Sequence, residues 1–88
     1  MAKISDLIEQ GILPVGTQLV WNRRGGKNFS AEVLANGAIK TADGRSHKSP
    51  SGAARSQVGR PVDGWTVWRT SDGTPLGELR TKLTRKIN

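Results

Sequence analysis

Two stretches decide the fold of this chain: Ser49-Pro50-Ser51-Gly52-Ala53-Ala54 and, shortly after it, Asp63-Gly64-Trp65-Thr66-Val67-Trp68. The first predicts the start of a helix, because serine caps free backbone N–H groups and proline suits the first helical position. In the second, Asp-Gly predicts a turn and residues 65–68 predict a β-strand, since aromatic and β-branched residues favour strands. A helix, a turn and an aromatic strand in close succession indicate a compact α+β core.

Helices are also predicted near both ends of the chain. A helix is predicted over residues 4–10. Its apolar face consists of Ile4, Leu7 and Ile8, with Ser5 as the N-cap and Gly11 as the stop. The last helix has Thr74 as its N-cap and Pro75 as its first residue. Its apolar stripe recurs at helical spacing through Leu76, Leu79, Leu83 and Ile87.

Alternating apolar residues between these helices predict strands at 17–22, 29–35 and 38–41. Asn36-Gly37 indicates a two-residue type I′ hairpin turn, in which both central residues need positive φ. Asp43-Gly44 indicates another tight turn before a short segment at 45–48. The predicted fold class is therefore α+β, a small antiparallel sheet with short helices packed on it in a single domain over residues 1–88.

The composition excludes several classes of protein. The 88 residues contain no cysteine, one histidine and no apolar run of the roughly 20 residues that span a bilayer. The start of the chain lacks the pattern of a secretory signal, so we expect a soluble cytoplasmic protein, nucleoid-associated if the source is bacterial. The 14 Lys and Arg residues against seven Asp and Glu give a formal charge of +7, which favours a polyanionic partner such as DNA.

Neither an enzyme nor a cofactor site is expected. The seven acidic residues are scattered, His47 has no neighbouring metal ligands, and Ser46-His47 are adjacent in sequence, which rarely gives triad geometry. The glycines of Gly25-Gly26-Lys27 lack the spacing of a phosphate-binding P-loop. We therefore expect no catalytic residue, metal, cofactor or small-molecule substrate.

Candidate DNA contacts fall into three groups. The first is a basic loop with Arg23, Arg24 and Lys27, which can follow a phosphate backbone or can be an ordinary solvated hairpin tip. The second surrounds the predicted helix start and comprises Lys48, Ser49, Ser51 and Arg55, whose alternative role is capping alone. The third is Trp65, which can stack on a base or pack half-buried, whereas Trp21 and Trp68 are expected in the core.

Several segments in order resemble the RAMA domain, the restriction enzyme adenine methylase associated module. They are residues 7–11, Pro14-Val15-Gly16-Thr17-Gln18-Leu19, Ala31-Glu32-Val33, Asn36-Gly37-Ala38-Ile39, Ser49-Pro50-Ser51-Gly52-Ala53-Ala54, Gly64-Trp65-Thr66-Val67-Trp68 and Leu76-Gly77-Glu78-Leu79-Arg80. The resemblance covers nearly the whole chain. It implies binding to double-stranded DNA and a role in sensing adenine methylation.

The resemblance leaves two alternatives to DNA binding open. The chain can be a protein-interaction subunit of a restriction-modification system, with a DNA methyltransferase or restriction component as partner, or a domain detached from a larger methyltransferase. The family usually has Asn-Gly-Trp where this chain has Asp63-Gly64-Trp65. An aspartate at this position can accept a hydrogen bond from a base amino group or can shape the turn.

Overall fold

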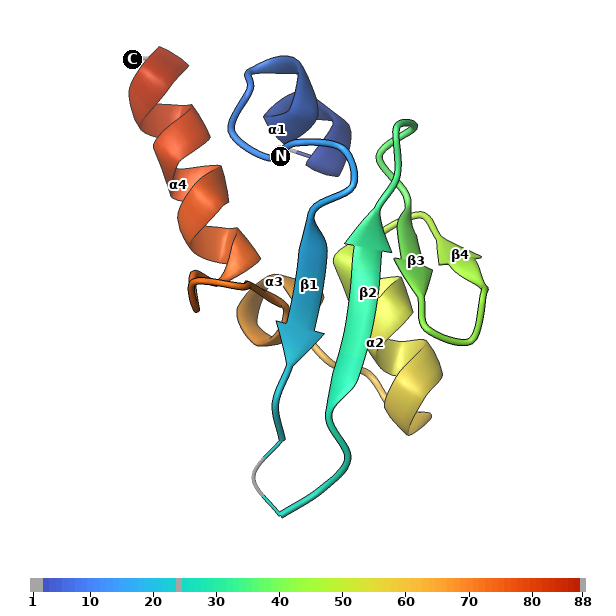
Figure 1. Ribbon diagram of the computed structural model, residues 1–88. Helices are drawn as coiled ribbons and strands as arrows, with labels where there is room; N and C mark the ends of the chain where they lie inside the picture. The colour runs from blue at the N-terminus through green and yellow to red at the C-terminus, as the bar shows by residue number, and fades with distance from the viewer. Residues whose placement is uncertain (1–2, 24, 88) are drawn as a thin grey trace.

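The computed structural model describes residues 3–23 and 25–87, with the side chains of residues 84–87 left undescribed. The described residues form four helices and five strands (Figure 1). The helices are α1 (Ile4–Glu9), α2 (Pro50–Val58), α3 (Gly64–Val67) and α4 (Leu76–Ile87). The strands are β1 (Gln18–Trp21), β2 (Phe29–Val33), β3 (Ile39–Thr41), β4 (Ser46–His47) and β5 (Arg69–Thr70). The predicted α+β class is confirmed.

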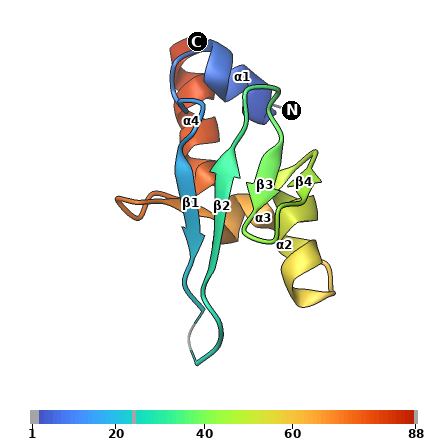
Figure 2. The same cartoon turned by 45° about the vertical axis from the view of Figure 1, so that its right-hand side comes forward.

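The strands form one antiparallel sheet in the order β4-β3-β2-β1-β5. Leu19 pairs with Ala31, and Val33 pairs with Ile39, so buried side chains from neighbouring strands share one face. Helices α2 and α3 lie behind this sheet in Figure 1, and the turned view of Figure 2 agrees. The opposite face carries exposed polar residues, which include Gln18, Ser30 and Lys40. The sheet therefore has one face packed against helices and one polar face.

The two tryptophans predicted for the core, Trp21 and Trp68, are buried to different extents. Trp68 is 0% exposed, and Trp21 is half-buried with its ring centroid 5.8 Å from that of Trp68 in an edge-on arrangement. The predicted apolar stripe of α4 is confirmed at Leu76, Leu79 and Leu83, which are all buried. The side chain of Ile87 lies outside the described part of the chain.

The junction of α2 and α3 brings together the two stretches at residues 49–54 and 63–68. A Cβ atom at Gly64 would lie 2.1 Å from the carbonyl carbon and oxygen of Pro50, so only glycine allows this approach. The Gly64 N–H donates to Ser51 Oγ at 3.0 Å, and Trp68 Nε1 donates to the Pro50 carbonyl at 3.0 Å. Buried Ala53 shows that α2 turns small side chains toward the core.

The strand predicted over residues 65–68 is wrong. Residues 64–67 form the single helical turn α3, and the strand β5 begins only at Arg69. Asp63 caps this turn, because its Oδ1 accepts from the Trp65 N–H at 3.1 Å and its Oδ2 accepts from Thr66 Oγ1 at 2.9 Å. Capping and packing on α2 outweigh the strand preference of Trp, Thr and Val.

Three hairpin turns share one pattern of hydrogen bonds. They are residues 34–38, 41–45 and 70–74, and in each the first residue pairs with the fifth and accepts from the N–H of the fourth, a glycine with φ of +85° to +90°. This is a three-residue loop with a glycine bulge. The type I′ turn predicted at Asn36-Gly37 is therefore wrong, since every described non-glycine residue, including Asn36, has negative φ.

Two of these turns hold an aspartate at the third position. Thr41 Oγ1 donates to Asp43 Oδ1 at 2.5 Å, and the Arg45 N–H donates to the same oxygen at 3.1 Å. These bonds favour the charged carboxylate and lower the pKa of Asp43. The Thr70 hydroxyl and the following turn backbone lower the pKa of Asp72 in the same way.

The remaining predictions differ from the structure mainly at element ends. The first helix ends at Glu9, and its N-cap is Lys3, not Ser5. The Lys3 N–H donates to Asp6 Oδ2 at 2.8 Å, which fixes the N-cap of α1 three residues before the aspartate. The short segment predicted at 45–48 contains strand β4, and Ser49 caps α2 with Pro50 as its first residue, as predicted.

Candidate functional site

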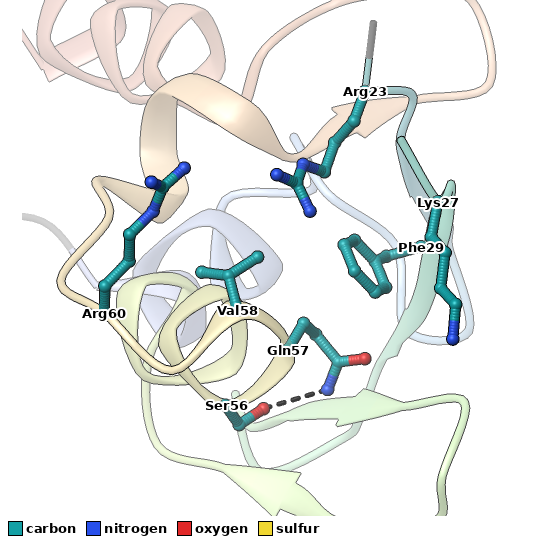
Figure 3. A pocket seen from close by; sticks show the side chains of 7 residues that line it. All are labelled: Arg23, Lys27, Phe29, Ser56, Gln57, Val58 and Arg60. Carbon is teal, nitrogen blue, oxygen red and sulfur yellow. Dashed lines mark hydrogen bonds between the residues drawn. The ribbon is translucent and has the colours of Figure 1, made fainter. Parts of the chain in front are cut away.

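A basic hollow of about 540 Å³ lies between the β1–β2 loop and the C-terminal end of α2 (Figure 3). Its lining comprises Arg23, Lys27, Phe29, Ser56, Gln57, Val58 and Arg60. The guanidinium groups of Arg23 and Arg60 point toward the hollow from opposite sides. Phe29 and Val58 add apolar surface, and Gln57 adds an amide. The hollow therefore combines positive charge, apolar walls and two neutral hydrogen-bonding side chains, Ser56 and Gln57.

Arg23 is held in place by the aromatic residues beside it. Its guanidinium carbon lies 5.7 Å from the Trp21 ring centroid and 5.8 Å from that of Phe29. The two rings are themselves packed, with centroids 5.3 Å apart. The backbone N–H of Arg23 donates to Asn28 Oδ1 at 3.2 Å across the loop. Cation–π contact and this loop bond orient Arg23, which reduces the entropy lost when an anion binds.

Arg60 reaches the hollow because α2 ends two residues before it. Gly59 has a left-handed φ of +73° and donates its N–H to the Arg55 carbonyl at 2.7 Å. Such a glycine stops a helix and redirects the chain. The exposed Arg60 consequently faces Arg23, which comes from a distant part of the sequence.

A second hollow of about 220 Å³ lies on α2. Its lining comprises Ser51, Gly52, Arg55, Pro61 and Val62. Ser51 and Arg55 are four residues apart and therefore lie on the same side of the helix. The structure thus places these two predicted contacts together, beside a hollow separate from that of Arg23 and Lys27.

The start of α2 carries the other two predicted residues of this group. Ser49 Oγ accepts from the Gly52 N–H at 3.1 Å, which confirms its capping role. Lys48 and Ser49 are exposed, and neither lines the two hollows. Eight residues of helix separate Ser49 from Gln57, a rise of about 12 Å. The predicted contacts therefore spread along α2 and do not form a single cluster.

Trp65 lies apart from both hollows, on α3. It is half-buried, and the guanidinium carbon of Arg80 lies 4.3 Å from its ring centroid. This arginine covers one face of the indole, so a base has only the other face for stacking. The role of Trp65 in DNA contact stays a prediction, and its half-buried packing agrees with the alternative given for it.

The charge around the two hollows is of one sign. Among the described lining residues are four cations, Arg23, Lys27, Arg55 and Arg60, and no carboxylate. Asp63 follows Val62 in sequence, but both of its carboxylate oxygens are engaged in capping α3. The sequence left two roles open for Asp63, contact with a base or shaping of the turn, and these bonds give it the second role.

Sequence reasoning missed Arg60, Gln57 and Ser56 at the first hollow. Arg60 directly follows the glycine that ends α2, and Ser56-Gln57 are consecutive polar residues in the last helical turn. A polar helix end followed by Gly-Arg was the available signal. Arg24, the remaining predicted loop contact, lies outside the described residues.

Neither a metal-ligand cluster nor a membrane-spanning helix occurs among the described residues. No group of three or more His, Cys, Asp or Glu side chains there could hold a metal ion. No helix among them has the length and apolar character needed to cross a bilayer.

A family model described as RAMA, Restriction Enzyme Adenine Methylase Associated, matches residues 1–88. A comparison with curated proteins found no match.

Proposed function

This chain belongs to the RAMA family, and from that premise we propose that it binds double-stranded DNA without catalysing a reaction. The observation that carries the proposal is the pair of hollows lined by four cations and no carboxylate among the described residues. DNA presents a dense row of phosphates, and cations that meet them release condensed counterions. Arg23, Lys27, Arg55 and Arg60 supply those contacts.

The shape of the molecule supports this placement. The β1–β2 loop projects beyond the sheet, and the C-terminal end of α2 lies toward the same end of the molecule in both views (Figures 1 and 2). A projecting loop beside a helix end can engage a groove while its cations hold the flanking phosphates. Lys48 and the Ser49 and Ser51 hydroxyls, farther along α2, extend the proposed contact. Arg24 and Trp65 stay proposed contacts as well.

Hydrogen bonding at Ser56 supports binding without catalysis. His47 Nε2 lies 3.2 Å from Ser56 Oγ, a pair that resembles a nucleophile and its base. However, the Ser56 hydroxyl donates to the Ala53 carbonyl at 2.7 Å and accepts from Gln57 Nε2 at 3.0 Å. Its proton is directed away from the imidazole, so the serine is not activated.

The salt dependence of duplex binding tests the proposal. With about four phosphate contacts, the logarithm of the affinity falls against the logarithm of the salt concentration with a slope near −3.6, about −0.9 per contact. Lys27→Ala makes this slope shallower by about 0.9. Lys40→Ala is the matched control, because Lys40 is an exposed lysine on the polar face of the sheet. A flat salt response for the unmodified protein contradicts DNA binding in this form.

The family description favours a second candidate function. A module associated with restriction enzyme adenine methylases can act by holding a methyltransferase or restriction subunit. This function predicts binding to such a protein that survives Lys27→Ala, together with a flat salt response to duplexes.

We propose further that the domain senses adenine methylation. Titration of duplexes with methylated and with unmethylated adenine tests this part of the DNA-binding proposal.

A further inference from the structure

We infer that Gln57 reads the edge of an adenine base, and that Ser56 and His47 position its amide for this contact. The inference rests on the proposed function, because it assigns a base-specific role within the proposed DNA interface. Gln57 lies in the last turn of α2 and lines the first hollow, with the nitrogen of its amide turned toward Ser56 (Figure 3). It is the neutral amide among the lining residues, and amides distinguish bases where cations mainly hold phosphates.

The hydroxyl of Ser56 fixes which way the Gln57 amide faces. Ser56 Oγ donates its single proton to the Ala53 carbonyl at 2.7 Å. It can therefore only accept from its other neighbours, and Gln57 Nε2 lies 3.0 Å away. A flipped amide would place two acceptor oxygens against each other. The nitrogen of Gln57 consequently faces Ser56, and its oxygen faces away.

His47 completes the environment of Ser56. His47 Nε2 lies 3.2 Å from Ser56 Oγ and 3.4 Å from Thr41 Oγ1. The Thr41 hydroxyl donates to Asp43 Oδ1, just as Ser56 donates to Ala53. Because both hydroxyl protons are already engaged, the imidazole can hydrogen-bond to either oxygen only through a hydrogen on Nε2. Ser56 then accepts from His47 and Gln57 together, and this network joins strand β4 to the end of α2.

The groups left over on Gln57 match one base. The amide nitrogen keeps a second N–H, and Oε1 has no hydrogen-bond partner among the described residues. A donor beside an acceptor pairs with N7 and the N6 amino group of adenine in the major groove. Guanine presents two acceptors there, so its O6 would face Oε1 of Gln57 without a proton between them. The chemistry therefore selects adenine over guanine.

The test compares three duplexes of one length: alternating dA-dT, the same duplex with 7-deazaadenine in place of adenine, and alternating dG-dC. Loss of N7 removes the acceptor without changing charge or base pairing. We expect the unmodified protein to bind the dA-dT duplex about tenfold more tightly than the other two. Gln57→Met keeps the length of the side chain, and it should abolish this preference while leaving the salt slope unchanged.

Two further variants distinguish a role of Gln57 in base recognition from a structural role. Ser56→Ala frees the amide to rotate, and it should reduce the preference for adenine without changing the salt slope. Gln18→Met is the matched control, because Gln18 is an exposed glutamine on the polar face of the sheet, and it should retain the full preference. Circular dichroism melting checks each fold, and if Ser56→Ala unfolds, Gln57→Met still decides the inference.

The outcomes distinguish this inference from the proposed function. Salt-dependent binding with equal affinity for all three duplexes overturns the reading role of Gln57 and leaves DNA binding intact. A preference for adenine that persists in Gln57→Met overturns it as well. Absence of binding to every duplex overturns the proposed function and, with it, the role of Gln57.

Discussion

Gly64 shows how one missing atom determines the junction of two helices. A Cβ atom at this position would lie 2.1 Å from the Pro50 carbonyl, far inside normal contact distance. We expect Gly64→Ala to lower the free energy of unfolding by about 3 kcal/mol, because the carbonyl is backbone and cannot move without shifting α2. Urea denaturation followed by circular dichroism measures the change.

Gly26→Ala is the control for this substitution. Its added Cβ atom would lie 3.6 Å from the nearest atom of Arg23, an ordinary contact, and the change should stay within about 0.5 kcal/mol. Equal stability of the Gly64 and Gly26 variants would contradict the close approach of α3 to α2.

Asp43 gives the stability of the protein a dependence on pH. Its folded-state pKa lies below the ordinary value of 3.8, chiefly because Thr41 donates a hydrogen bond to the carboxylate. A lowered pKa contributes stability that is complete above the ordinary value and is lost as the pH falls through the folded value. We therefore expect Asp43→Asn to lower the melting temperature at pH 7, and the difference from the unmodified protein to close once the pH is below the folded pKa.

The hairpin at 34–38 offers the matched comparison for Asp43. Asn36 occupies the equivalent position and accepts from the Ala38 N–H at 3.0 Å, but Leu34 stands where Thr41 supplies its hydroxyl. The stability that Asn36→Asp adds at pH 7 and loses in acid should therefore be smaller than the stability that Asp43 contributes in the same way. Parallel pH dependences for the unmodified protein and Asp43→Asn would refute the role given to the Thr41 bond.

At the scale of elements, Trp68 joins α2 to the strand that follows α3. It is 0% exposed, and its Nε1 is the donor to the Pro50 carbonyl. Trp68→Phe keeps an aromatic ring but removes the indole N–H that bonds this buried carbonyl, so we expect a loss of about 2 kcal/mol. Thermal or urea unfolding measures it.

Trp65→Phe is the comparison for Trp68, since Trp65 is only half-buried and packs against Arg80. Its loss should be under about 1 kcal/mol. A larger loss at Trp65 than at Trp68 would reverse the relative importance given to the two rings.

The sequence predicted elements best where local signals and packing agree. The serine and proline at the start of α2 predicted its first turn, and alternation predicted the strands of the central hairpins. Residues 65–68 failed because a capping aspartate and a contact with α2, remote in sequence, override strand preference. The turn at Asn36 failed because Asn-Gly also suits a longer loop, in which only the glycine needs positive φ.

The candidate site was less predictable than the elements. Basic residues in the β1–β2 loop were visible in the sequence, but Arg60 and Gln57 join them only because the sheet and α2 bring their ends together. Local sequence also could not show that Arg80 covers a face of Trp65. Composition predicted a basic protein, and the arrangement of tertiary contacts decided which cations share a hollow.

At the scale of the whole molecule, the effect of where the cations lie on DNA binding can be separated from the effect of the net charge. The hollow with Lys27 and Arg60 lies toward the end of the molecule that carries the β1–β2 loop, whereas α1 lies at the opposite end (Figures 1 and 2). Lys27→Glu with Arg60→Glu changes the net charge as much as Lys3→Glu with Lys40→Glu does. If the hollow holds phosphates, the first pair should weaken duplex binding at least about tenfold and make the salt slope shallower by about 1.8. The second pair should keep the slope and lose only a small part of the affinity to long-range repulsion, which salt screens. Duplex titrations at several salt concentrations measure both quantities, and equal losses in the two proteins would mean that overall charge, not the hollow, attracts DNA.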